Sequence, residues 1–113
     1  MHELSIVLNI VETAEEQVRK HQASRVESID LSIGKLAGIE MLALDFAWEA
    51  AAPNTVLENA ERHIDAVPAR ARCMECGHEF PVSELYEACP KCQEYLTEIV
   101  QGRELKIQSM TLI

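Results

Sequence analysis

Four cysteines, arranged as two CxxC pairs, constrain the fold of this chain more than any other feature. The pairs are Cys73 with Cys76 and Cys89 with Cys92, with twelve residues between them, and the chain has no other cysteine. Two CxxC pairs at this separation are typical of a tetrahedral site in which four thiolates bind one metal ion, most often zinc. Because four protein ligands leave no open coordination position, such a site is structural rather than catalytic.

Other uses of the cysteines fit the sequence less well. Two disulfides would suit a secreted chain, but the sequence opens with Met1-His2-Glu3 and without a basic and apolar signal segment. A thioredoxin-like redox protein would use one CxxC pair, and there are two here. Iron stays open, because it also accepts four thiolates in a tetrahedron. An iron-loaded chain would be a rubredoxin-like electron carrier, and its Fe(III) form would absorb visible light.

The charge of the chain argues against nucleic acid as a partner. The sequence has 19 acidic and 10 basic residues and a net charge of −9. Its surface should therefore repel the phosphate backbone that some zinc ribbons bind. The 113 residues suffice for one small domain, or for one domain with an insert. Because no apolar run is long enough to span a bilayer, we expect a soluble cytoplasmic protein that is not associated with a membrane.

Hydrophobic periodicity predicts two helices and several strands. Apolar residues at three- and four-residue spacing predict helices over about 4–21 and about 40–51. Alternation predicts a strand over about 28–33, an extended segment over about 62–71, and a last strand that begins near 104 and changes phase before Met110. The apolar stripes, which an amphipathic helix turns toward the core, are Leu4, Val7, Leu8, Val11, Ala14 and Val18 in the first helix and Leu42, Ala43, Phe46, Ala47 and Ala50 in the second.

The order of these elements predicts an α+β fold. Isolated strand pairs are not stable in water, so the last strand is expected to return to the sheet made by the first two. The cysteine segment then becomes an insertion. We therefore predict two helices packed on a small three-stranded sheet, formed by residues 1–69 and 101–113, with an inserted zinc-ribbon-like module over residues 70–100.

The amino terminus offers a second metal site. A methionine ahead of a large residue is normally retained, so we expect the amine of Met1 to precede His2. That amine, the backbone nitrogen of His2 and its imidazole can form adjacent chelate rings around one ion, and Glu3 can supply a further donor. Planar, nitrogen-rich donors suit Ni(II) or Cu(II) better than zinc. The competing interpretation is a frayed terminus with an incidental histidine.

The chain resembles a known family of metal carriers. Its opening, Met1-His2-Glu3-Leu4-Ser5, resembles the start of the HypA/HybF nickel metallochaperones of hydrogenase maturation. The resemblance extends over essentially the whole chain in the expected order. It includes Ile33-Gly34-Lys35-Leu36, the helix with Phe46 and Glu49, the segment Pro53-Asn54-Thr55-Val56-Leu57-Glu58-Asn59-Ala60, both cysteine pairs and Gly102-Arg103-Glu104-Leu105.

This resemblance implies a set of nickel ligands. His2 would be the essential ligand, the Met1 amine and Glu3 would complete or support the site, and Glu40 falls where family members can carry a carboxylate near the nickel. Glu40 can equally be a helix-start carboxylate that meets the positive end of the helix dipole. Nickel would be labile cargo bound by the α/β domain, and zinc would be a structural ion held by Cys73, Cys76, Cys89 and Cys92.

The same resemblance implies a function and partners. The chain would deliver nickel during maturation of [NiFe]-hydrogenase, together with a GTPase that drives nickel insertion and a hydrogenase large subunit that receives the ion. Some family members also serve urease. The alternative is a zinc-ribbon interaction module without a second metal. We expect no enzyme activity, because no Ser-His-Asp or Cys-His nucleophile pair is identifiable.

The remaining histidines give weaker signals. His21 ends the first predicted helix, where a cation suits the helix dipole. His63 begins an extended segment and has no visible partner. His78 follows the first cysteine pair and is interpreted as a solvated residue, with a pH-sensing role as the alternative. In some relatives a histidine follows the last cysteine, but Gln93 stands there in this chain.

Overall fold

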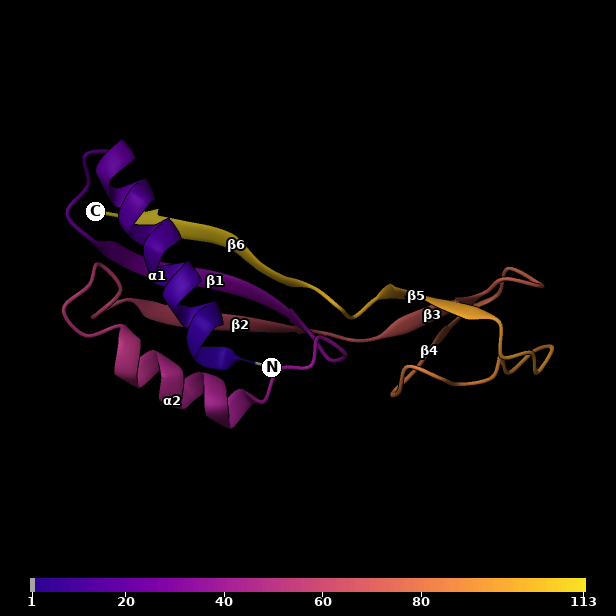
Figure 1. Cartoon of the computed structure of the whole chain (residues 1–113). Coiled ribbons are helices and arrows are strands. Elements are labelled where there is room, and N and C mark those ends of the chain that lie inside the picture. The colour runs from indigo at the N-terminus through magenta and orange to yellow at the C-terminus, as the bar shows by residue number, and fades with distance from the viewer. Residues whose placement is uncertain (1) are drawn as a thin grey trace. The chain divides into compact units, whose positions relative to one another are not determined.

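The protein is described here by a computed structural model that covers residues 2–113, so Met1 and its predicted amine ligand lie outside the described residues. The elements follow in the order α1 (Glu3–Lys20), β1 (Val26–Gly34), α2 (Met41–Ala51), β2 (Glu61–Val67), β3 (Arg70–Cys73), β4 (Glu79–Pro81), β5 (Thr97–Gln101) and β6 (Leu105–Leu112) (Figure 1). The chain divides into two compact units. The helical unit comprises residues up to 31, 39–64 and 107–113, and the cysteine unit comprises 32–38 and 65–106.

The first sheet has the strand order β2-β1-β6, with β1 in the centre. This confirms that the last strand returns to the sheet made by the first two. In the helical unit the chain end is fixed by backbone hydrogen bonds, because Ser24 and Arg25 donate to the carbonyl of Ile113 at 2.6 and 3.0 Å and Ile113 donates back to Arg25 at 3.0 Å. Figure 1 shows α1 and α2 beside this sheet. The predicted class, two helices with small sheets and a cysteine ribbon, is therefore confirmed.

The core of the helical unit uses a narrower set of residues than the apolar stripes predict. In α1 the buried residues are one stripe, Val7, Ile10, Ala14 and Val18, whereas Leu4 and Leu8 are each 51% exposed. In α2 the prediction of the buried face is wrong except at Ala47, the one residue of the predicted stripe that is buried. Leu42 and Phe46 are 69% and 73% exposed, and the buried residues are Leu44, Ala47 and Trp48.

An interaction between α2 and β2 explains which face of α2 is buried. The guanidinium of Arg62 lies 4.9 Å from the ring centroid of Trp48 and also pairs with Asp45 at 2.8 Å. The side of α2 that carries Asp45 and Trp48 must therefore face β2. Trp48 offers the largest buried area in this helix and a cation–π contact in addition. Because α2 is apolar on several sides, residue spacing alone cannot select the face that packs.

The cysteine unit is built on a second sheet, with the strand order β4-β3-β5 and antiparallel pairing throughout. The extended segment predicted over 62–71 is two strands, β2 and β3, interrupted at Pro68 and Ala69. Proline lacks the N–H that a continuing ladder needs, which explains the interruption. The small core of this unit contains Ala71, Cys73, Phe80 and Cys89, with Val82 and Ile99 packed against it. Two of these four core residues are cysteines, so two of the predicted metal ligands are also packing residues.

A glycine in the cysteine unit permits close approach of two backbone segments. The N–H of Gly34 donates to the carbonyl of Glu104 at 2.7 Å, and Leu36 donates to the carbonyl of Gly102 at 2.7 Å. A Cβ atom at position 34 would overlap the carbonyl group of Gly102. The clash is with backbone, which cannot rotate away as a flexible side chain could.

We therefore expect Gly34→Ala to destabilise the protein by about 1–3 kcal/mol or more, as overpacking does. Urea unfolding of the zinc-loaded protein measures this loss. Gly77→Asn is the matched control, because Gly77 has a φ of +77°, open space around its Cβ position, and a conformation that asparagine tolerates. Equal midpoints for Gly34→Ala and the unchanged protein would contradict the close approach.

No helix within residues 2–113 is long and apolar enough to cross a membrane.

Candidate metal centres

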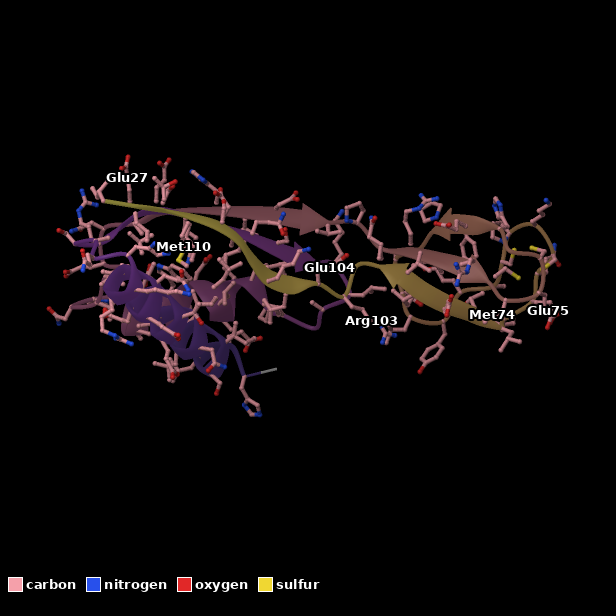
Figure 2. The ribbon with its side chains drawn as sticks, turned by 90° about the horizontal axis from the view of Figure 1, so that it is seen from above. Glu27, Met74, Glu75, Arg103, Glu104 and Met110 are labelled. Atoms are coloured by element: carbon pink, nitrogen blue, oxygen red, sulfur yellow. The ribbon has the colours of Figure 1, made fainter. Side chains whose placement is uncertain are left out.

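The four cysteines converge in the cysteine unit. Their sulfur atoms all lie within 4.8 Å of one another, and within residues 2–113 they are the only group of three or more potential ligand residues that does so. The Sγ atoms of Cys73 and Cys92 are 3.4 Å apart, and those of Cys76 and Cys89 are 3.7 Å apart. Cys73 and Cys89 are buried, whereas Cys76 and Cys92 are exposed. Figure 2 labels Met74 and Glu75, which lie between the first two cysteines in the sequence, at the end of the cysteine unit where several sulfur atoms are drawn.

Both cysteine pairs are closed by the same local turn. Gly77 donates its N–H to the carbonyl of Cys73 at 2.9 Å, and Gln93 donates to Cys89 at 2.7 Å. Both donors have positive φ, +77° for Gly77 and +66° for Gln93. A left-handed residue after the second cysteine therefore turns each pair back on itself. The sequence signals the first turn through its glycine, whereas Gln93 carries no such signal.

The electrostatics of the four thiols favour a bound cation. The backbone N–H of Cys76 lowers the pKa of Cys73. Desolvation opposes ionisation of Cys89, but the backbone N–H groups of Cys92 and Lys91 outweigh it and lower the pKa to about 7. For Cys92 the N–H of Glu94 lowers the pKa, yet the neighbouring sulfurs, Cys73 first, raise it to about 12. Four neighbouring thiols cannot all ionise to thiolates without a counter-charge, so the donor set fits a soft or borderline divalent ion.

At the other candidate site the structure brings Glu3 and Glu40 together. His2 is exposed and precedes α1, where it makes no side-chain capping hydrogen bond. The Oε2 atom of Glu3 accepts a hydrogen bond of 3.0 Å from the backbone N–H of Glu40. Glu40 is the residue that caps α2, and its own Oε1 accepts from the N–H of Leu42 at 3.2 Å. Two carboxylates thus meet at the start of α2, beside the segment that carries His2.

The contact between Glu3 and Glu40 also has an electrostatic consequence. The N–H of Glu40 lowers the pKa of Glu3 below its usual 4.5. A lowered pKa means that the contact contributes to stability above about pH 4.5 and that this contribution is lost as the pH falls through the lowered value. The sequence identified both residues as candidates, but their contact spans 37 positions and has no local sequence signal.

The other histidines are placed as follows. His21 caps the carboxyl end of α1, as predicted. His78 is exposed, with its ring stacked on Phe80 at 6.1 Å. The expectation that His63 has no partner is wrong, because its Nδ1 lies 2.9 Å from Asp30 and its Nε2 lies 3.2 Å from Glu61. Glu61 lies two residues away on the same side of β2, whereas Asp30 lies in β1. Only the pairing of the two strands brings Asp30 within reach of His63.

The fold and its four-cysteine cluster define a metal-binding protein. A family model described as "Hydrogenase/urease nickel incorporation, metallochaperone, hypA" matches residues 1–112. The chain belongs to this HypA family: it is a metallochaperone of nickel incorporation in hydrogenase maturation, and not an enzyme. The resemblance found in the sequence is thereby confirmed.

Individual relatives and solved structures agree with this assignment. The chain is 40% identical over 112 residues to the hydrogenase maturation factor HypA of Chlorobaculum tepidum, covering 99% of each chain. It is 44% identical over 112 residues to the factor of the same name from Pelodictyon phaeoclathratiforme, covering 99% of this chain and 96% of that one. The solution structure of the Ni metallochaperone HypA from Helicobacter pylori is similar over 100% of this chain and 98% of that chain, with a TM-score of 0.71 and 28% identity.

Proposed function

We propose that this chain binds Ni(II) at its amino terminus and delivers it to a hydrogenase. His2 is the essential ligand, and the Met1 amine completes the chelate. The observation that carries this proposal is the hydrogen bond from the N–H of Glu40 to Glu3, which holds the first turn of α1 against the start of α2. The adjacent His2 is the N-cap residue of α1, and its side chain makes no capping hydrogen bond. A nickel titration of the zinc-loaded protein with its native amino terminus tests it. One tightly bound nickel ion per chain is expected.

We further propose that Cys73, Cys76, Cys89 and Cys92 hold a structural Zn(II). The convergence of four sulfurs within 4.8 Å and their need for a counter-charge support this role. When bound, zinc supplies the charge that lets all four thiolates form at once. In domain terms, residues 1–69 with 101–113 would carry the nickel site and residues 70–100 the zinc site.

Glu3 is proposed to support the nickel site rather than to ligate the ion. One of its oxygens is already engaged by Glu40, so its first role is to position the segment that bears His2. Glu3→Gln keeps an oxygen that can accept this hydrogen bond, whereas Glu3→Ala removes it. We expect nickel affinity to fall clearly in Glu3→Ala and little in Glu3→Gln.

The matching structural readout is hydrogen exchange at the Glu40 amide. Exchange should be faster in Glu3→Ala than in Glu3→Gln, because only the alanine variant leaves that N–H without its acceptor. Equal loss of nickel affinity in both variants, with unchanged exchange, would assign the Glu3 carboxylate to the ion itself.

The proposed partners are a nickel-inserting GTPase and a hydrogenase large subunit, in the cytoplasm, with urease maturation as a further recipient pathway. We propose that the GTPase docks on the helical unit, where the ion is handed over. Large exposed apolar residues of both helices support this surface: Leu4 and Leu8, one turn apart in α1, and Leu42 and Phe46, one turn apart in α2. Exposed apolar anchors of this kind are typical of protein interfaces.

Replacing two of these anchors tests the docking surface. We expect Leu42→Ser with Phe46→Ser to weaken GTPase binding about tenfold or more, because side chains 69% and 73% exposed contribute to an interface and little to the core. Tyr86→Ser with Tyr95→Ser is the matched control in the cysteine unit, where these side chains are 85% and 73% exposed. Affinity measured by calorimetry should fall only for the helical pair. If GTPase affinity fell for the tyrosine pair and not for the helical pair, the docking site would lie on the cysteine unit instead.

A further inference from the structure

A chain of polar side chains joins all three strands of the first sheet within the helical unit. The Nε2 atom of His63 lies 3.2 Å from Oε1 of Glu61, and its Nδ1 lies 2.9 Å from Oδ1 of Asp30. The second oxygen of Asp30 accepts a hydrogen bond of 2.7 Å from the hydroxyl of Ser109. Glu61 and His63 come from β2, Asp30 from β1 and Ser109 from β6. None of these residues belongs to the cysteine cluster or to the amino-terminal site.

The partners of His63 fix the orientation of its imidazole. An ionised carboxylate only accepts hydrogen bonds, so Nδ1 carries the proton that is donated to Asp30. The hydroxyl of Ser109 occupies the other oxygen of Asp30 and holds this carboxylate in place. In the neutral imidazole the lone pair is then on Nε2 and faces Glu61. Asp30 first, and Glu61 with it, raise the pKa of His63, so a metal ion at Nε2 would take the place of a proton there. A histidine that donates its Nδ1–H to a carboxylate while Nε2 binds the ion is the arrangement found at many metal sites.

The separation of Nε2 from the carboxylate of Glu61 suits two ligands of one ion. Metal–nitrogen and metal–oxygen bonds of about 2.0–2.1 Å, at angles between square and tetrahedral, place the two donor atoms about 2.9–3.4 Å apart. The observed 3.2 Å lies inside this range. A positive charge must lie between these two atoms at this distance, either the proton of the imidazolium or a metal ion that replaces it. Both side chains are open to solvent, at 75% for Glu61 and 52% for His63, so water can supply the remaining ligands.

We propose that His63 and Glu61 form an accessory site for a divalent transition-metal ion, with Asp30 and Ser109 positioning the imidazole. Imidazole with carboxylate and water suits Ni(II) and Zn(II), whereas Mg²⁺ and Ca²⁺ prefer oxygen donors alone. The carboxylates of Asp30 and Glu61 supply two negative charges beside the ring, which a divalent ion that displaces the ring proton neutralises. With only two side-chain ligands the site is weaker than the four-thiolate cluster and can exchange its ion.

The test uses the zinc-loaded full chain carrying His2→Ala, so that the proposed amino-terminal site does not contribute. Calorimetry with added Ni(II) should show one weak binding event. His63→Gln should abolish this event, and Glu61→Gln should weaken it. Asp30→Asn should weaken it about 10–100-fold, as removal of an orienting carboxylate does at other metal sites. His21→Gln, at an exposed histidine of the same unit, is the control that should leave the event unchanged.

A second measurement identifies the ligating atom. In the nitrogen-15 spectrum of the histidine rings, added Zn(II) should shift Nε2 of His63 and leave its Nδ1–H in place. Glu61 has a largely exposed side chain, so Glu61→Gln removes a ligand without removing core packing, and its unfolding midpoint checks that the fold is intact. Three outcomes would overturn the proposal: weak Ni(II) binding that survives in His63→Gln, a metal ion bound to Nδ1, or no binding of either ion. Failure of nickel binding at His2 would leave it untouched.

Discussion

Replacing Cys89 by alanine should release the structural zinc and unfold the cysteine unit while the helical unit stays folded. Cys89 is fully buried and forms one quarter of a four-residue core with Ala71, Cys73 and Phe80. So small a core cannot offset the conformational entropy of ordering the 49 residues of this unit. Zinc binding contributes about 10–16 kcal/mol to such modules, which is comparable with the whole stability of an ordinary domain. Loss of one thiolate therefore costs the unit its main source of stability.

Zinc content, circular dichroism and hydrogen exchange measure this outcome. Cys76→Ala should behave like Cys89→Ala although Cys76 is exposed, because both residues are proposed zinc ligands. Met74→Ala is the matched control, since Met74 lies inside the same CxxC pair, is 54% exposed and offers no thiolate. If Cys76→Ala retained its zinc and slow exchange over residues 70–100, the four-thiolate assignment would be wrong. Chelation of zinc from the unchanged protein should reproduce the loss of order in the cysteine unit.

Replacing His2 by alanine should abolish tight nickel binding and leave the zinc content unchanged. An extension added ahead of Met1 should have the same effect, because it converts the terminal amine into an amide and so breaks the chelate. The thiolates contribute nothing to the nickel site, so zinc serves as an internal measure of folding. Added zinc should compete poorly, since planar nitrogen donors do not match its tetrahedral preference.

Two controls make the nickel experiment specific. His21→Ala removes an exposed histidine from the other end of α1 and should not change tight nickel binding. The same extension placed after Ile113 should also have no effect. If the amino-terminally extended protein bound nickel with full affinity, the amine would not be a ligand, and His2 would act with other donors.

The cysteine spacing, the helix and strand periods and the opening residues could all be interpreted without coordinates, because each is a local pattern. The helices found at Glu3–Lys20 and Met41–Ala51 lie within one residue of their predicted bounds. Strands β4 and β5 were not predicted, because three and five residues of mixed polarity carry too weak an alternation. The predicted core positions Leu42 and Phe46 were wrong for a different reason, since α2 has more than one apolar side.

The sequence by itself determined the four-cysteine cluster and the α+β class, because cysteine spacing and hydrophobic period act over a few residues. The family was identified from the resemblance of whole segments to known proteins. Only the tertiary structure decided which residues meet over long separations. Arg62 selects the buried face of α2 through Trp48, Glu3 reaches the amide of Glu40, and His63 lies between Glu61 and Asp30. Such contacts depend on strand pairing and helix packing, which are set by the sum of many weak interactions rather than by any local motif.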